Sequence, residues 1–474
     1  MRDMSPRIPR SVLPALLFAT ALAHAAPARG PEGRWQGSIM GAIRLGLAIE
    51  RTAEGSLRAT MDSPDQGAMG MKLDSLVFSG DSLRFRLLIS QGEYAGRLSA
   101  GGDSLVGVWK QGGMTVPLAF KRGEPPAPSR PQEPRAPYPY DTLAVAYDNP
   151  RAAGVRLTGT LTLPRGKGPF PAVLLLTGSG QQDRDETVAG HKPFMVLADH
   201  LTRQGIAVLR VDDRGMGGST GPVESATSED FAGDALAGVE FLSKRRDIAR
   251  RIGLVGHSEG GVIAPLVATR SKDVAFLVLL AAPGLPGDSL LLLQTVETRR
   301  SLGVTPAHVE RELQAARRVW AAVRAGDSLA SAGALRGLIE AQLAPLPESQ
   351  REAGGSLDEL WTAGMRQIWS PWMRYFATHD PAPVLHRVRV PVLALNGGLD
   401  TQVTPTENLG GIEAALRAGG NRDVTVRELP GLNHLFQTCR TGALSEYATL
   451  EETFAPAALE LVSDWIRKRV GLRR

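Results

Sequence analysis

The feature that most constrains the fold is a short stretch, Arg251 to Pro265, in which a serine stands between glycines. The apolar run Ile252–Val255 is typical of a buried strand, and Gly261–Thr269 is typical of a packed helix. Gly256-His-Ser-Glu-Gly260 lies between them. A G-x-S-x-G sequence in this position predicts a strained turn that projects the hydroxyl of Ser258 from the carboxyl edge of a sheet. An ordinary glycine-rich turn is the alternative interpretation, but the flanking strand and helix favour the strained turn that exposes Ser258.

Other serine motifs in the chain lack this context. Gly217–Gly221 also fits G-x-S-x-G, but the preceding apolar run ends at Val211 and no helical pattern begins after it. We therefore expect Ser219 to be a loop residue. Gly-Asp-Ser-Leu occurs at 80–83, 102–105, 287–290 and 326–329, and repeated copies cannot all supply a nucleophile. Because Gly, Asp and Ser are common in turns and helix caps, these copies predict turns and caps.

From Pro171 onward, continuous apolar runs alternate with helical patterns such as Lys192–Gln204 and Glu229–Ser243. The apolar runs are Ala172–Leu176, Ile206–Val211, Ile252–Val255, Val274–Ala281 and Val392–Leu395. Strands of this kind are buried on both faces, so the pattern predicts a parallel sheet with helices on each side. The alternation stops at residues 286–388, where a mostly helical pattern predicts an inserted cap over the carboxyl edge of the sheet.

Two polar residues on later loops are the candidates to act with Ser258. The run Val392–Leu395 leads into Asn396-Gly-Gly-Leu-Asp400, and the run Val424–Glu428 leads into Leu429-Pro-Gly-Leu-Asn-His434. Both loops follow strand ends, and the order serine, aspartate, histidine is the one that the G-x-S-x-G turn predicts. His434 would accept the proton of Ser258, while Asp400 would hold the imidazole in the required tautomer.

The loop after Ala172–Leu176 is the candidate to complete an oxyanion hole, which needs two backbone donors. One donor should be the N–H of Glu259, directly after the nucleophile. The other should be the N–H of Ser179, because the glycines at 178 and 180 let its backbone approach a substrate. We expect Asp183 and Arg184 to form a local ion pair that shapes this loop. Asp213 and Arg214 are interpreted as structural, and Cys439 as a buried free thiol rather than a site residue.

Residues 31–122 have a different pattern. Apolar residues alternate with others along Ile43–Ile49 and Leu83–Ile89, and glycine-rich turns separate such runs. This pattern predicts antiparallel strands with one face buried, in a small all-β domain that is lipocalin-like or a half-barrel. The Pro-rich segment 123–137 predicts an extended linker. A second domain, 138–474, should then open with a hairpin formed by Leu143–Tyr147 and Val155–Leu163.

The first residues, 1–25, are typical of a secretory signal peptide. Arg2, Arg7 and Arg10 precede an apolar run, Val12–Ala23, which is followed by the cleavage site Ala23-His-Ala25. The run is far shorter than the ~20 residues that span a bilayer, so no integral membrane span is expected after its removal. Cleavage would remove three arginines and one aspartate and lower the formal charge from +5 to +3. This small surplus indicates no nucleic-acid partner, and the single cysteine fits a secreted or periplasmic protein without an internal disulfide.

The predicted cap carries a cluster of aromatic residues. Trp361, Trp369, Trp372, Tyr375 and Phe376 lie within sixteen positions of one another. An apolar substrate pocket that includes Trp369, Trp372 and Tyr375 is one interpretation, and packing of the cap's own core is the other. Pro371 predicts a bend between the two nearest tryptophans.

These motifs together resemble the α/β-hydrolase superfamily over about 300 residues, from Pro171 to the C-terminus. Gly178-Ser-Gly180, Asp213-Arg-Gly215, Gly256-His-Ser-Glu-Gly260 and the loops that carry Asp400 and His434 support the resemblance. Within the superfamily the chain is similar to secreted esterases of the serine aminopeptidase and dienelactone hydrolase branches.

The resemblance implies a serine hydrolase that acts through an acyl-enzyme without metal or cofactor. We expect a carboxylesterase whose substrates are small-molecule esters with small acyl groups. One alternative is a serine peptidase of the aminopeptidase or prolyl-oligopeptidase type, which needs a charged group to anchor a peptide terminus. The other is a ligand-binding protein whose hydrolase domain is inert.

Overall fold

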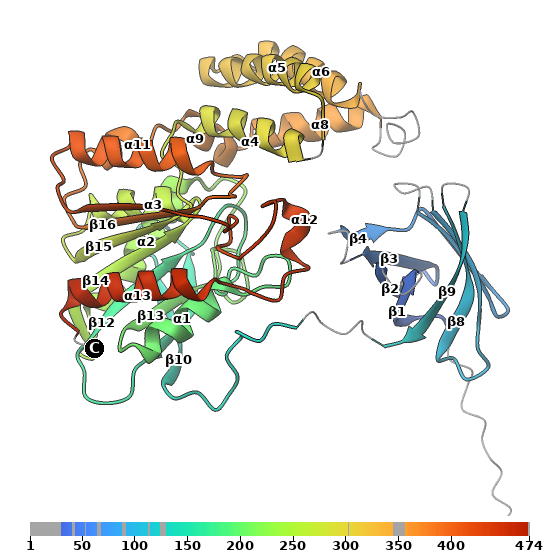
Figure 1. Cartoon of the computed structure of the whole chain (residues 1–474), viewed down its shortest axis with the longest axis horizontal. Coiled ribbons are helices and arrows are strands. Elements are labelled where there is room, and N and C mark those ends of the chain that lie inside the picture. The colour runs from blue at the N-terminus through green and yellow to red at the C-terminus, as the bar shows by residue number, and fades with distance from the viewer. Residues whose placement is uncertain are drawn as a thin grey trace, which may run out of the picture.

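The structure, a computed structural model, contains two β-sheets (Figure 1). It describes residues 30–472, apart from 40–42, 53, 64–67, 88–91, 112–113, 124–128, 302 and 345–355. The predicted signal peptide at 1–25 therefore lies outside the described residues. None of the described helices is both long enough and apolar enough to cross a membrane.

The first sheet is a nine-stranded antiparallel meander in the order β4-β3-β2-β1-β9-β8-β7-β6-β5. Its strands are β1 (Gly33–Ile39), β2 (Ile43–Arg51), β3 (Leu57–Ser63), β4 (Ala68–Lys72), β5 (Ser75–Ser79), β6 (Ser82–Leu87), β7 (Gly92–Leu98), β8 (Ser104–Gln111) and β9 (Met114–Arg122). The sheet curls around one buried face, on which Trp35, Phe85, Tyr94 and Phe120 form the centre of a separate core. The prediction of a half-barrel is confirmed.

The second sheet has eight strands in the order β10-β11-β13-β12-β14-β15-β16-β17. Its strands are β10 (Asp141–Asp148), β11 (Arg156–Leu163), β12 (Phe170–Leu176), β13 (Ala207–Val211), β14 (Ile248–His257), β15 (Val274–Leu280), β16 (Val392–Gly397) and β17 (Val424–Leu429). β10 and β11 form the predicted antiparallel hairpin, and β13, β12, β14, β15, β16 and β17 pair in parallel. Every strand predicted in this region is present, with small differences at the ends.

Helices cover both faces of this sheet, because its central strands are apolar on both sides. On one face α1 (Pro193–Arg203) and α13 (Pro456–Val470) pack against side chains such as Val173, Val255 and Leu393. On the other face α2 (Ser228–Ser243), α3 (Gly260–Ala268), α10 (Ala382–Leu385) and α11 (Pro405–Ala418) pack against Leu174, Leu254 and Ala394. A further short helix, α12 (Leu444–Tyr447), follows β17.

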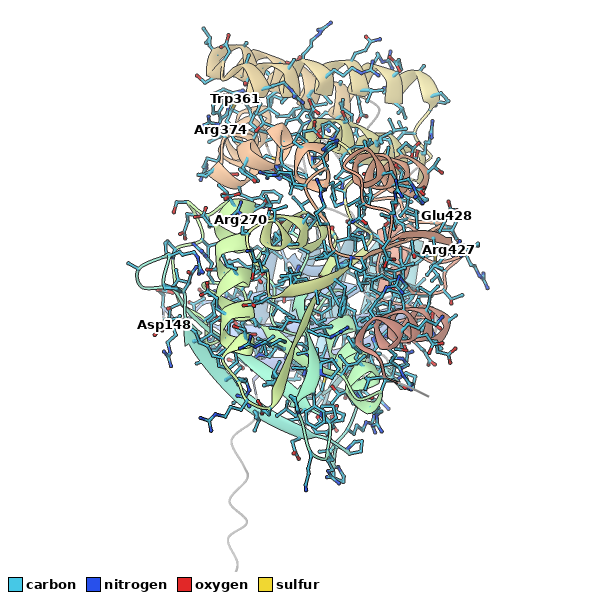
Figure 2. All side chains as sticks on the ribbon, turned by 90° about the vertical axis from the view of Figure 1, so that its left-hand side faces the viewer. Asp148, Arg270, Trp361, Arg374, Arg427 and Glu428 are labelled. Atoms are coloured by element: carbon cyan, nitrogen blue, oxygen red, sulfur yellow. The ribbon has the colours of Figure 1, made fainter. Side chains whose placement is uncertain are left out.

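The predicted cap is also present. Between β15 and β16, the secondary-structure elements of the described residues are all helices. These are α4 (Gly287–Ser301), α5 (Pro306–Ala325), α6 (Ser328–Leu343), α8 (Leu357–Ile368), α9 (Pro371–Thr378) and α10. Figure 1 and Figure 2 show the cap helices on one side of the sheet domain, with Trp361 and Arg374 among them. The cap has its own core, which includes Val319, Leu335 and Ile368.

Candidate active site

The turn around Ser258 has the geometry that its sequence predicts. Ser258 directly follows β14 and has a φ of 52°, a conformation that only a constrained turn imposes on a non-glycine residue. A Cβ atom on Gly256 would lie 2.1 Å from the carbonyl oxygen of Gly260, and one on Gly260 would lie 2.2 Å from that of Leu176. Both positions therefore require glycine, and α3 begins immediately after the turn.

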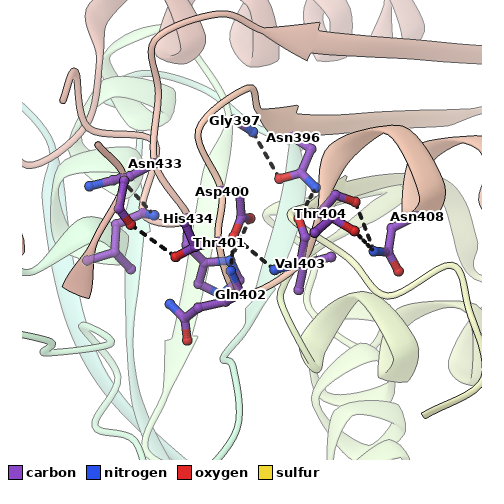
Figure 3. Close-up of polar contacts among 12 residues, drawn as sticks. Asn396, Gly397, Asp400, Thr401, Gln402, Val403, Thr404, Asn408, Asn433 and His434 are labelled. Carbon is purple, nitrogen blue, oxygen red and sulfur yellow. Dashed lines mark hydrogen bonds and ion pairs between the residues drawn. The ribbon is translucent and has the colours of Figure 1, made fainter. Parts of the chain in front are cut away.

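Asp400 and His434 meet at the same edge of the sheet, because they follow the neighbouring parallel strands β16 and β17 (Figure 3). Nδ1 of His434 lies 2.7 Å from Oδ2 of Asp400, and both residues are buried. The other carboxylate oxygen, Oδ1, accepts the N–H groups of Gln402 and Val403. A carboxylate can only accept, so the proton of the imidazole lies on Nδ1 and leaves Nε2 free to act as a base.

A second histidine, His257, links the serine turn to the loop of His434. Its Nε2 lies 3.0 Å from the carbonyl oxygen of His434, and the two imidazole rings lie 4.7 Å apart. Its Nδ1 lies 2.8 Å from Oε1 of Glu186. Burial alone lowers the pKa of His257, but the adjacent carboxylate outweighs burial and raises the pKa above its ordinary value. No sequence pattern predicts this pair, since Glu186 lies 71 residues before His257 and belongs to no motif.

The same carboxylate also holds the loop at residues 177–184, which is predicted to complete the oxyanion hole and is called the oxyanion loop below. Oε1 of Glu186 accepts the N–H of Gly178 at 2.7 Å, so that N–H is already used. A Cβ atom on Gly178 would lie 3.2 Å from Cβ of Ser258, which places this loop beside the nucleophile. The side chain of the next residue, Ser179, lies near the Glu259 carboxylate and lowers its pKa, against the larger effect of burial. The structure thus brings Ser179 and Glu259 together beside Ser258, and their role as backbone donors stays a prediction.

The ion pairs of this region differ in part from the prediction. Arg184 binds Asp212 through its guanidinium and its backbone N–H, at 3.0 Å and 2.8 Å from Oδ1. The carboxylate of Asp183 instead accepts the backbone N–H groups of Asp185 and Thr187, which follow it on the same loop. The predicted Asp183–Arg184 pair is therefore wrong, because neighbouring side chains on this loop point to different partners.

Asp213 and Arg214 do have the structural role that was predicted. Asp213 accepts the hydroxyl of Thr177 and the N–H of Gln182, each at 2.9 Å, and so holds the oxyanion loop on the neighbouring strand end. Arg214 binds the Asp234 carboxylate at 2.7 and 2.8 Å in a buried pair. Burial raises the pKa of Asp213 to about 7.

The other serine motifs are structural. The hydroxyl of Ser219 donates to the carbonyl oxygen of Asp212 at 2.8 Å and accepts the N–H of Thr158 at 2.9 Å. Ser82 and Ser104 begin strands, and Asp327 caps α6 directly before Ser328. Cys439 is a free thiol that is only partly buried. Within the described residues, no group of acidic, histidine and cysteine side chains has the arrangement of a metal site.

A cavity of about 370 Å³ lies beside the oxyanion loop. Its apolar lining residues are Val223, Ala226, Phe231 and Trp372, and its polar ones include Ser179, Asp213 and Arg214. The indole of Trp372 donates to Oε1 of Glu259 at 2.8 Å, so this cap residue reaches the residue after the nucleophile.

The other two predicted pocket residues lie elsewhere. Trp369 packs on the core of the cap, with the guanidinium of Arg374 4.9 Å from its ring. Tyr375 stacks on His379 and hydrogen-bonds to Glu229. The cap bends between Trp369 and Trp372 as expected, since α8 ends at Ile368 and Pro371 begins α9. The structure thus places only Trp372 of the three at the cavity.

Comparison with known proteins finds a relative that is named an esterase. The chain is 29% identical over 280 residues to the esterase EstD of Thermotoga maritima, a match that covers 59% of this chain and 58% of EstD. The chain thus spans somewhat more than half the length of this relative.

Solved structures of esterases are also similar. The Pyrococcus furiosus esterase Pf2001 matches with 16% identity and a TM-score of 0.42, over 72% of this chain and 97% of the esterase. Est1E from Butyrivibrio proteoclasticus matches with 14% identity and a TM-score of 0.38, over 69% and 99%.

One family model spans residues 153–410, which is more than half of the chain and includes Ser258 and Asp400. That family is described as X-Pro dipeptidyl-peptidase (S15 family). The region matched includes most of the second sheet and the whole cap. The protein therefore belongs to the X-Pro dipeptidyl-peptidase (S15) family.

Proposed function

We propose that the protein is a serine hydrolase of the carboxylesterase type, with Ser258, His434 and Asp400 as its catalytic triad. The observation that carries this proposal is the 2.7 Å hydrogen bond between His434 and Asp400, on the two loops that the fold brings to the edge where Ser258 projects. The bond fixes Nε2 of His434 as the proton acceptor.

The reaction follows from these roles. Oγ of Ser258 attacks the ester carbonyl carbon while Nε2 of His434 takes the serine proton. The tetrahedral intermediate collapses, the bond to the alcohol oxygen breaks, and the imidazolium returns the proton to that oxygen. Water then attacks the acyl-enzyme with the same histidine as base, which releases the acid and restores the serine hydroxyl. The backbone N–H groups of Ser179 and Glu259 would stabilise the oxyanion in both steps.

An ester is favoured over a peptide, although the family is named for a peptidase activity. The relative with 29% identity is named an esterase. In addition, the carboxylates in and next to the cavity already have partners. Asp213, which lines it, accepts from Thr177 and Gln182, and Glu259 accepts from Ser228 and from the lining residue Trp372. A peptidase that cuts near a free amino terminus needs a carboxylate available for its ammonium group.

The deciding experiment is a turnover screen with the purified protein. Nitrophenyl esters of increasing acyl length would be compared with aminoacyl and prolyl anilides. We expect esters to be cleaved and anilides to be cleaved far more slowly. Preferred cleavage of the anilides would support the peptidase alternative. Failure of a fluorophosphonate to label Ser258 would support an inert hydrolase domain.

We also propose that the protein acts outside the cytoplasm, secreted or in the periplasm, after cleavage near Ala25. The charged and apolar pattern of residues 1–25 supports this location. Fractionation of cells followed by sequencing of the mature amino terminus tests it. A full-length protein in the cytoplasmic fraction would contradict it.

A further inference from the structure

The side chain of Glu259 has contacts that its backbone role does not require. It is 2% exposed, and its Oε1 accepts the hydroxyl of Ser228 at 2.6 Å and the indole N–H of Trp372 at 2.8 Å. The side chain of Ser179 also lies near this carboxylate and lowers its pKa. One carboxylate thus joins the start of α2, the cap helix α9 and the oxyanion loop. Burial of a carboxylate is costly unless hydrogen bonds compensate for it. Here the donors offset burial only in part, because burial still raises the pKa of Glu259 above its ordinary value.

Two of these partners, Ser179 and Trp372, also line the cavity of about 370 Å³. Trp372 forms part of its apolar wall together with Val223, Ala226 and Phe231. The stacked ring of Phe376, 5.3 Å from that of Trp372, supports this wall from the cap side. The Glu259–Trp372 hydrogen bond therefore connects this wall to the residue directly after Ser258.

The charged groups at the cavity are paired within the protein, so the cavity offers no free charge to a substrate. Arg214 is neutralised by Asp234 in a buried pair. Asp213 uses both carboxylate oxygens within the protein, and burial raises its pKa to about 7, so it is about half protonated at neutral pH and mostly uncharged at lower pH. A charged substituent would enter without a free counterion, whereas an uncharged apolar substituent would bury its surface against the wall.

We propose that Glu259 is a positioning residue that holds the Trp372 wall and Ser179 in place beside the nucleophile, and that the cavity so formed selects esters with an uncharged, apolar substituent. This inference rests on the proposed esterase function, whose own test is the Ser258-dependent cleavage of any ester. The substituent could be the acyl group or the alcohol, and the experiment distinguishes the two.

The test compares Trp372→Phe with Trp361→Phe. Both variants keep an aromatic ring in the cap and lose an indole N–H. Trp361 donates instead to the carbonyl oxygen of Ala332 within the cap. Values of kcat/KM would be measured for nitrophenyl esters from acetate to octanoate and for acetates of alcohols from methyl to phenylethyl, together with Tm. We expect Trp372→Phe to change the ratio of long to short substrates in one series by roughly threefold to tenfold. Trp361→Phe should leave both ratios unchanged.

Val223→Phe tests the cavity itself from a partly exposed loop position. The larger ring should reduce kcat/KM for the longest substrates by about tenfold or more while cleavage of small esters continues. Glu259→Gln should resemble Trp372→Phe in its substrate profile, because the carboxylate oxygen that accepts the indole N–H of Trp372 is replaced. If Trp372→Phe and Val223→Phe both cleave the two series with wild-type ratios, the inference is overturned while the esterase function stands. If the wild-type protein cleaves no ester, the function itself fails.

Discussion

At the scale of single residues, strained backbone is concentrated where the chemistry is proposed. The non-glycine residues with positive φ in the described chain include Ser258, Glu186, Ala281 and Phe436. Ser258 is the nucleophile candidate, Glu186 binds His257 and Gly178, Ala281 directly follows β15, and Phe436 lies two residues after His434. Such conformations persist only where surrounding contacts impose them. The carboxyl edge of the sheet is therefore built to hold side chains in set positions.

The first prediction concerns the triad. Ser258→Ala or His434→Ala should lower kcat for ester cleavage by about 10⁴-fold or more, because each removes a group that takes part in bond making or proton transfer. Circular dichroism and Tm would establish that the fold is intact. Ser219→Ala, in the second G-x-S-x-G sequence, is the matched control and should change only Tm. Near wild-type turnover by folded Ser258→Ala would exclude the proposed mechanism.

The second prediction concerns two adjacent aspartates with opposite pKa shifts. Burial raises the pKa of Asp213 to about 7, so the folded protein binds a proton there more readily than the unfolded chain does. The free energy of unfolding should therefore fall as pH rises from about 4 to about 7 on account of this group. Asp213→Asn mimics the neutral acid and should be more stable than the wild type at pH 8, on the order of 1 kcal/mol.

Asp212 is the control for that experiment. Burial alone raises its pKa, but hydrogen bonds from Arg184 outweigh burial, and the pKa lies below its ordinary value. Its contribution to stability is present at neutral pH and is lost as pH falls through the folded-state pKa. Asp212→Asn should therefore destabilise the protein at pH 8. Denaturant unfolding of both variants between pH 4 and pH 8 checks the direction of each change in the free energy of unfolding. Destabilisation by Asp213→Asn at pH 8 would contradict the prediction for Asp213.

At the scale of elements, the break between α8 and α9 places two nearby tryptophans in different surroundings. Ser370 caps α9 by accepting the N–H of Met373, and Pro371 occupies the first turn, where its missing N–H costs nothing. As a result Trp369 faces the core of the cap and Trp372 faces Glu259. Residues 369–372 thus contribute one tryptophan to the core of the cap and one to the surroundings of Glu259.

The third prediction follows from this separation. Trp372→Ala should change the preferred chain length of the substrate and raise KM, with only a small decrease in Tm. Trp369→Ala should lower stability by about 2 kcal/mol or more through lost packing and leave the chain-length profile unchanged. Steady-state kinetics and thermal unfolding of both variants test the pair. A Trp372→Ala variant that unfolds earlier with an unchanged profile would place the substrate pocket elsewhere.

At the scale of the whole molecule, the segment between the two sheets is more than a spacer. Arg130 donates to the carbonyl oxygens of Leu450 and Ala448 at 2.5 and 3.0 Å. Gln132 donates to the carbonyl oxygen of Phe454 and accepts the N–H groups of Thr453 and Phe454. The second half of the Pro-rich segment, predicted as a linker over 123–137, is therefore packed on the hydrolase domain.

The fourth prediction uses these contacts. Because the first sheet has its own core, a variant that starts at Ser129 should fold and cleave small esters with kcat/KM close to that of the full chain. A variant that starts at Tyr138 lacks Arg130 and Gln132 and loses the five hydrogen bonds that these residues form with residues 448–454. It should be less stable by about 2–5 kcal/mol, since each net hydrogen bond contributes about 0.5–1 kcal/mol. Thermal unfolding and ester kinetics compare the two. Loss of activity in the longer variant would show that the first sheet takes part in the reaction.

The sequence by itself determined the half-barrel, the parallel sheet, the helical cap and the loops that carry Ser258, Asp400 and His434. Those features depend on periodicity and on strand ends, which are local properties, and parallel strands bring their carboxyl ends to one edge whatever the loops between them. Only the tertiary structure decided which side chains pair. Arg184 binds Asp212 rather than its neighbour Asp183, Glu186 binds His257, and Glu259 binds Trp372 from the cap. Each partner lies on a segment far away in sequence, and loop conformation sets which donor and acceptor come within hydrogen-bonding distance, so no local pattern encodes these pairs.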